Sequence, residues 1–164
     1  MLKYIFIGWI GLMSCSSWAT PLDEVRNKFP YYETEAEVDQ YLTLLASDTS
    51  ALATVYKGAL YMFKSKFSSF PTTQYKYFKK GKNLINSACQ ALPNAMEIRF
   101  IRLVFQYQLP GFLGYNNHKE SDFRFFISNY SKSELNAERK LKLKLQLLQL
   151  EKLEPEKIKQ LNQL

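Results

Sequence analysis

The sequence is poor in the side chains that most often carry chemistry. Its 164 residues include one histidine, His118, and two cysteines, Cys15 and Cys89. It lacks the HExxH, CxxC, GxSxG and phosphate-binding glycine-loop motifs, whose spacing brings metal ligands, nucleophiles or phosphate-binding amides together. A lone histidine between Asn and Lys is typical of a surface residue. We therefore expect no catalytic residue, no metal and no cofactor, and an enzyme of unrecognised type is the least favoured alternative.

Glycine and proline are also scarce, at six residues each, and no Gly-, Pro- or Ser-rich stretch marks a linker. The length and the missing linker predict one domain. Aromatic residues make up 15% of the chain, so many rings must be buried and the chain is not disordered. The formal charge of +7 would attract anionic partners. The dense basic run Arg139–Lys144 has acids beside it, which is typical of a solvated helix face, and we expect no nucleic-acid partner.

The first 19 residues have the pattern of a secretion signal. Lys3 supplies a positive charge, and the apolar stretch Tyr4–Met13 is too short to span a bilayer. The triplet Ser17–Ala19 places small residues where a signal peptidase needs them. We expect cleavage between Ala19 and Thr20, a mature domain of residues 20–164, and a location in the periplasm or cell envelope.

A second processing pattern competes with this cleavage. The segment Leu12–Cys15 resembles the lipobox of bacterial lipoproteins, in which the cysteine is lipidated and becomes the first residue, although Met13 is unusual there. Under either pattern Cys89 is the single thiol of the mature chain, and it cannot form an internal disulfide. Cys89 falls on the apolar side of a helical pattern, which predicts a small buried hydrophobic residue.

Hydrophobic periodicity predicts a chain of helices separated by short breaks. The first three helices are expected over 22–28, from a capping box at Thr34–Glu37 to 45, and from 48–50 to 67. The next three are expected from a cap at Thr72 or Thr73 to 92, over 95–108, and around 123–127. The last two are expected after a cap at Ser131–Glu134, through the leucine-rich segment, and over 156–161. Leucines 141–147 alternate as in a strand, but Leu, Lys and Gln favour a helix. This helix would have two opposed leucine stripes, and we expect it to be packed on both sides or against a partner. Gly58, inside a helix, indicates close approach of a neighbouring helix.

The predicted fold class is all-α, an irregular bundle of antiparallel helix pairs. Gly81, Ile85, Ala88 and Pro93 have the spacing of the second helix of a tetratricopeptide unit, so a tetratricopeptide-like arrangement is an open alternative. The helix over 95–108 is apolar nearly all round, which is typical of a central buried helix.

Two arginines interrupt this apolar helix. Arg99 and Arg102 lie three residues apart, hence on neighbouring positions of one face. A buried arginine requires an anion, and Glu97, Glu120 and Asp122 are the candidate partners. We favour an internal ion-pair network that fixes the loop 112–122 against the helix. The alternatives are a binding site for a carboxylate or phosphate group and a site for an uncharacterised partner.

The loop itself is aromatic and hinged by Gly114, and it contains Tyr115. If it is packed, the segment 112–117 is a turn between helices, which we favour. If it is exposed, it would form a peptide-binding lip.

Several short motifs in the middle of the chain carry a family resemblance. They are Tyr56–Ala59, Tyr77–Lys82, Glu97–Arg102 with Gln106, and Pro110–Tyr115 with Asp122. Together they resemble a family of uncharacterised exported helical proteins from Bacteroidetes. The similarity covers roughly residues 56–129, and its specific part is the pair Glu-Ile-Arg-Phe-Ile-Arg and Phe-Leu-Gly-Tyr. The resemblance implies a signal peptide and a helical fold, and it implies no activity.

The function we expect is therefore binding of an unidentified protein or peptide, or a scaffold role, in the cell envelope. The alternative is a protein associated with the membrane surface, held there by the basic Leu/Lys helix near its C-terminus or by a lipidated Cys15.

Overall fold

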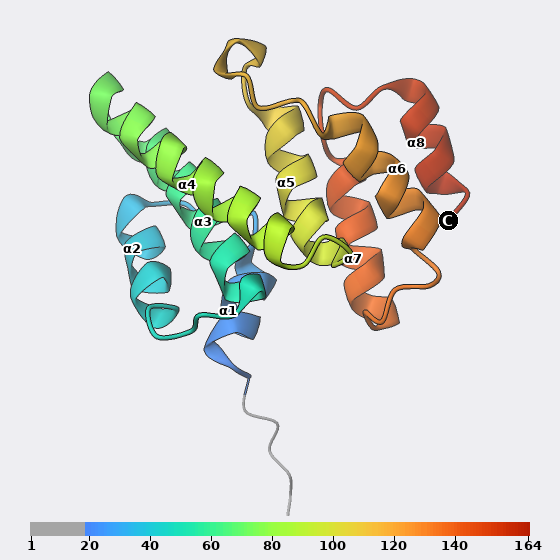
Figure 1. Cartoon of the computed structure of the whole chain (residues 1–164), viewed down its shortest axis with the longest axis horizontal. Helices are drawn as coiled ribbons and strands as arrows, with labels where there is room; N and C mark the ends of the chain where they lie inside the picture. Colours follow the sequence, from blue (N-terminus) through green and yellow to red (C-terminus); the bar gives the residue numbers. More distant parts are fainter. Residues whose placement is uncertain (1–18) are drawn as a thin grey trace, which may run out of the picture.

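The computed structural model describes residues 19–164, and it is all-helical over that range (Figure 1). The elements are α1 (Pro21–Lys28), α2 (Glu35–Leu44), α3 (Ala51–Phe67), α4 (Pro71–Ala91), α5 (Met96–Gln108), the 3₁₀ turn η1 (Gly111–Leu113), α6 (Lys119–Asn129), α7 (Ala137–Leu148) and α8 (Pro155–Asn162). The all-α prediction is confirmed, and the leucine-rich segment is a helix. None of these helices is both long enough and apolar enough to cross a membrane.

The expected signal segment lies outside the described residues, except for its last position. Cys15, the lipidation candidate, also lies outside them. Ala19 and Thr20, which flank the expected cleavage site, are exposed. Thr20 caps α1: its hydroxyl accepts from Asp23 N at 3.1 Å, and the Asp23 carboxylate accepts from Thr20 N. This reciprocal pair is a capping box at the start of the described fold.

Short polar side chains cap α2 and α3 near the expected positions. Thr34 Oγ1 accepts from Glu37 N at 3.1 Å, and Ser50 Oγ accepts from Ala53 N at 3.1 Å. The Glu37 carboxylate, expected to reach back to Thr34, instead accepts from Glu33 N at 2.8 Å. Both helices therefore begin with one first-turn amide satisfied by a side chain.

Two other helix starts differ from the prediction. α4 begins at Pro71, and neither Thr72 nor Thr73 caps it, because proline is well suited to the first helical position, where no N–H is needed. α7 begins after Asn136, whose side-chain oxygen accepts from the backbone of Arg139 at 2.8 Å. The expected cap at Ser131–Glu134 is therefore wrong, since that segment lies in the loop before Asn136.

α3 and α4 form an antiparallel hairpin whose backbones touch (Figure 1). A Cβ atom built on Gly81 would lie 2.7 Å from the carbonyl oxygen of Gly58 and 3.0 Å from Met62 Cγ. A Cβ on Gly58 would lie 2.7 Å from Ile85 Cγ1. The close helix approach predicted from Gly58 is confirmed, and Gly81 supplies the other side of it.

α5 is the central helix and stands between the group α1–α4 and the group α6–α8 (Figure 1). Most of its side chains are buried. Aromatic packing joins it to its neighbours: the ring of Phe29 meets Tyr56, Phe63, Phe100 and Phe105 edge to face, with centroids between 5.9 and 6.5 Å apart. This edge-to-face geometry is the favoured one for aromatic pairs.

α7 has the two opposed leucine stripes that the sequence predicts. Leu143 and Leu147 are fully buried, whereas Leu141 and Leu145 are about half exposed. One stripe therefore packs into the bundle and the other faces outward. The tetratricopeptide-like arrangement stays a prediction.

Candidate functional site

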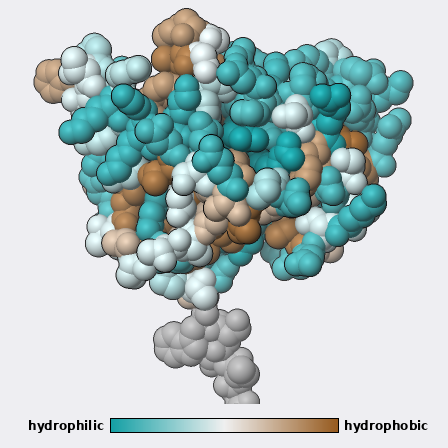
Figure 2. Space-filling model, viewed as in Figure 1, coloured by the Kyte–Doolittle hydropathy of each residue, from teal (hydrophilic) through white to brown (hydrophobic). Residues whose placement is uncertain are grey.

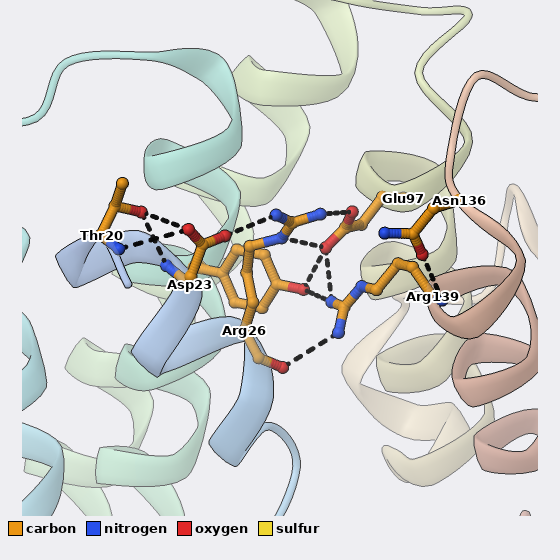
Figure 3. Close-up of polar contacts among 7 residues, drawn as sticks. Thr20, Asp23, Arg26, Glu97, Asn136 and Arg139 are labelled. Carbon is orange, nitrogen blue, oxygen red and sulfur yellow. Dashed lines mark hydrogen bonds and ion pairs between the residues drawn. The ribbon is translucent and has the colours of Figure 1, made fainter. Parts of the chain in front are cut away.

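A buried carboxylate, Glu97, joins three helices near the start of α5 (Figure 3). Arg26 of α1 binds it through two parallel hydrogen bonds, Nε to Oε1 at 2.9 Å and Nη2 to Oε2 at 2.7 Å. Tyr56 of α3 donates its hydroxyl to Oε1 at 2.6 Å, and Arg139 of α7 donates a guanidinium N–H to the same oxygen. Glu97 is 3% exposed, so the cluster lies inside the fold.

The charges of this cluster alternate and cancel. Asp23 accepts from Arg26 Nη1 at 2.9 Å, which gives the series Asp23, Arg26, Glu97, Arg139 with two negative and two positive groups. Burial by itself would raise the pKa of Glu97, but the hydrogen bonds from Arg26 and Tyr56 and the charge of Arg139 lower it below the usual value. Burial raises the pKa of Tyr56 well above 10, so the phenol stays protonated and acts as a donor. The charges of the cluster therefore sum to zero, although the buried Nε of Arg139 has no hydrogen-bond partner within the described part of the chain.

A second buried carboxylate, Asp122 of α6, lies against another face of α5. Arg102 binds it through two bonds, Nε to Oδ2 at 2.7 Å and Nη2 to Oδ1 at 2.8 Å. Arg99 Nε donates to Oδ1 at 2.8 Å, and Gln106 Nε2 donates to Oδ2 at 3.1 Å. Asp122 is 1% exposed, and the Arg99 guanidinium also stacks 4.0 Å from the centre of the Phe125 ring. The carboxylate occupies the place between the two guanidinium groups that an external anion would need.

The candidate partners of Arg99 and Arg102 therefore separate. Asp122 pairs with both arginines, whereas Glu97 and Glu120 do not contact them. Glu120 pairs with Lys157 of α8. Arg99 and Arg102 lie two and five residues after Glu97, so they point to the opposite side of the helix. Glu97 therefore faces α1 and α7, and the two arginines face α6.

The loop after α5 is partly packed and partly exposed. Tyr115 is buried; its hydroxyl lies 3.3 Å from Asn86 Oδ1, and its ring meets Phe78 edge to face. Phe112, in η1, is 87% exposed. The segment is therefore a turn anchored on α4 by Tyr115, with one aromatic ring projecting from it.

The remaining single residues lie where the sequence predicts. His118 is exposed at the start of α6, and its backbone N donates to Gln106 Oε1 at 2.8 Å. Cys89 is buried on α4, and burial raises the pKa of its thiol to about 11. Among residues 19–164 no group of three His, Cys, Asp or Glu side chains has the geometry of a metal site.

The basic segment of α7 differs from the expected solvated face. Arg139 is 8% exposed and paired with Glu97, so its interpretation as a surface charge is wrong. Lys142 Nζ donates to the carbonyl oxygen of Asn27 at 2.7 Å. These two cations fasten α7 to the end of α1.

A groove of about 540 Å³ opens between α3, α5, α7 and the turn after α1. Its wall is mainly apolar, with Met62 and Phe63 from α3, Val104 and Phe105 from α5, and Leu150 after α7. Two further hollows, of about 310 and 190 Å³, continue from it around the C-terminal end of α5. The first shares Gln108, Gln149 and Leu150 with the groove. The depression is thus mainly apolar between α3, α5 and α7, and its continuation around the end of α5 is about half polar.

Polar groups surround this groove and lie beneath it. Tyr31 donates its hydroxyl to Gln149 at 2.8 Å on one rim, and the exposed Lys66 stands on another without an acidic partner among the described residues. Gln146, 7% exposed, lines the groove and donates from Nε2 to the carbonyl of Phe29 at 2.7 Å. Its Oε1 is buried and has no hydrogen-bond partner within the described part of the chain. An unpaired buried acceptor costs about 1–3 kcal/mol, so this wall is not optimised for stability alone.

Sequence reasoning missed Arg26, Tyr56 and Arg139 around Glu97, and it missed the groove. Arg26, Tyr56 and Arg139 lie 71, 41 and 42 residues from Glu97 along the chain, so no local sequence spacing predicts these contacts. A glutamate inside an apolar helix was the available signal, because such a charge needs donors from other helices.

Comparison with protein-family models, with curated proteins and with solved structures finds no match to this chain. The resemblance to exported proteins from Bacteroidetes therefore stays a prediction.

Proposed function

We propose that this chain is a non-enzymatic binding protein of the cell envelope that holds a peptide segment of another protein in the groove between α3, α5 and α7. The observation that carries this proposal is the apolar groove with its continuation around the end of α5. Its wall is apolar and its rim polar, which is the usual anatomy of a site that recognises a peptide. The envelope location follows from the signal-like pattern of residues 1–19.

The charges at the rim specify the partner further. Lys66 and Lys152 line the connected hollows without acidic partners among the described residues, and Glu151 is the one acidic residue in the described lining. An excess of positive charge at a rim favours an acidic ligand. The expected ligand is therefore an extended segment with apolar side chains for the groove and acidic residues for the rim.

Selection from a displayed library of random peptides tests this proposal. Peptides recovered with the unaltered protein are measured by fluorescence polarisation against Lys66→Glu, which reverses a rim charge, and Gln108→Trp, which covers the groove. Lys132→Glu and Gln90→Trp are the matched controls, because both positions are exposed and lie outside the groove. We expect the groove variants to weaken binding at least tenfold, about 1.4 kcal/mol, and the controls to leave it unchanged.

Two outcomes would overturn the proposal. One is a selection that recovers no peptide above the blank. The other is a set of peptides whose binding is indifferent to both groove variants, since such peptides bind elsewhere.

A further inference from the structure

The net positive charge of this chain equals the charge of one segment. Residues 49–96 contain no Asp, Glu or Arg, and they carry the lysines Lys57, Lys64, Lys66, Lys76, Lys79, Lys80 and Lys82. Their formal charge equals the +7 of the whole chain, so the remainder sums to zero (7 − 7). This segment is the α3–α4 hairpin. The basic character of the protein is therefore a property of one structural unit.

Few of these lysines are neutralised within the fold. Among the described residues, Lys64 is the one that forms ion pairs, with Asp39 and Glu35 of α2. Lys76, Lys79 and Lys80 are exposed on α4. Their spacing of three and four residues places them on one face of the helix. That face of α4 carries three cations and no acid, so its field is not cancelled locally.

Two exposed aromatic rings belong to segments at the start of α4 and in the turn held against it. Phe70, at the start of α4, is 72% exposed, and Phe112, in η1, is 87% exposed. The first turn of α4 and the η1 turn both project at the upper edge of the molecule (Figure 1). Figure 2 shows hydrophobic side chains at the upper projection and a single hydrophobic side chain at the upper left edge, with a largely hydrophilic surface between them.

The η1 projection is held against α4. Tyr115, two residues after η1, packs its ring on Phe78 of α4 with centroids 6.3 Å apart, and its hydroxyl bonds to Asn86 at 3.3 Å. Lys82 Nζ lies 5.5 Å from the centre of the Tyr115 ring. Phe112 is thus positioned by contacts to the same helix that carries the lysines.

We propose that the lysine face of α4, with the exposed rings of Phe70 and Phe112, docks this protein onto an anionic lipid surface. Lysines near such a surface gain energy from its negative potential, and aromatic tips enter the boundary between headgroups and acyl chains. The separated positions of the two rings favour lipid over nucleic acid, because base stacking requires rings along the path of the phosphates. The docking face is distinct from the peptide groove and independent of it.

Sedimentation with vesicles tests this inference. The same purified form of the full chain is used throughout, with vesicles of phosphatidylcholine alone or mixed with phosphatidylglycerol. The triple variant K76Q/K79Q/K80Q is compared with K132Q/K152Q/K159Q, which removes the same charge from exposed positions outside the hairpin. Each lysine near the surface should contribute about fivefold to the partition coefficient. We therefore expect K76Q/K79Q/K80Q to lose on the order of 100-fold in partition to anionic vesicles, and K132Q/K152Q/K159Q to lose less than about threefold.

The aromatic contribution has its own signature. We expect Phe112→Ser to lose on the order of tenfold, and the loss to persist at high salt, because burial of a ring in the interface is not screened. Circular dichroism melts confirm that each variant is folded before it is compared.

Three results would overturn the inference. Equal losses in both triple variants would indicate attraction by net charge without a docking face. Equal binding to phosphatidylcholine alone would remove the role of the lysines. Tighter binding to double-stranded DNA than to anionic vesicles, with the same dependence on the α4 lysines, would assign the face to nucleic acid.

Discussion

Replacing Glu97 with glutamine should destabilise this protein far more than its conservative chemistry suggests. Glutamine keeps the shape of the side chain and one acceptor oxygen, but it removes the charge between Arg26 and Arg139. Arg26 is partly exposed and retains Asp23 as a partner. The Arg139 side chain is 9% exposed, and Glu97 is its acidic partner in the described structure. Glu97→Gln therefore leaves a buried guanidinium without an anion.

The expected cost is that of breaking a buried ion pair by removing one partner, about 3–5 kcal/mol. With an m-value of about 2 kcal/mol/M in urea, the midpoint of unfolding should fall by about 1.5–2.5 M. Glu134→Gln is the matched control, because Glu134 is exposed and has no ion pair among the described residues; we expect a change within about 0.5 kcal/mol. Urea titration followed by circular dichroism measures both.

A double variant checks the cause. If the unpaired charge of Arg139 is responsible, Glu97→Gln combined with Arg139→Met should be less destabilised than the sum of the two single variants, by about 0.5–3 kcal/mol. A loss below about 1 kcal/mol in Glu97→Gln at an unchanged m-value, or strict additivity in the double variant, would refute the assignment of this cluster as a coupled buried network.

The same residue makes stability depend on pH. The pKa of Glu97 is lower in the folded chain than in the unfolded chain, so the unfolded state binds its proton first as the pH falls. The stabilisation is complete above the unfolded pKa of about 4.3 and is lost as the pH falls through the lower folded value. Glu97→Gln should therefore flatten the acid limb of the stability curve relative to Glu134→Gln, and an unchanged limb would contradict this reasoning.

Three further predictions test the packing. Gly81→Ala should cost about 1–3 kcal/mol because its Cβ meets backbone, whereas Gly111→Ala, with open space around it, should cost nothing measurable by thermal denaturation. Leu143→Ala should cost about 2–5 kcal/mol and Leu141→Ala less than about 1 kcal/mol, since the first is fully buried and the second half exposed. Iodoacetamide at pH 8 should leave Cys89 unlabelled in the native chain and label it in urea, because its thiol has a pKa of about 11.

Local sequence patterns predict most of the fold. Hydrophobic periodicity places the helices, a glycine inside a helix indicates the close hairpin contact, and the apolar helix over 95–108 becomes the centre of the bundle. The first residues of α4 and α7 are harder to predict from the sequence. Several Ser, Thr and Asn side chains near each start could cap it, and the packing of the completed bundle decides between them.

The two charged clusters also differ in how far the sequence predicts their partners. Asp122 lies 23 residues after Arg99 and 20 residues after Arg102 along the chain. It is among the candidate partners of the two arginines because the loop between their helices is short. The partners of Glu97 come from three other helices and are set by tertiary structure alone. The basic face of α4 shows in the sequence as an absence of acids between Asp48 and Glu97, so a search for dense cationic runs leads instead to Arg139–Lys144.

The two carboxylate clusters have a joint consequence for the bundle. Glu97 ties α5 to α1, α3 and α7, and Asp122 ties α6 to the opposite side of α5. Apolar attraction is non-directional, so it specifies the relative position of two helices less sharply than hydrogen bonds do. A bidentate arginine–carboxylate pair loses its hydrogen bonds after a shift of about 1 Å. We infer that the two clusters fix the register of the helices around α5, and that the Glu97 cluster, which ties α3 and α7 to α5, thereby sets the width of the groove between these three helices.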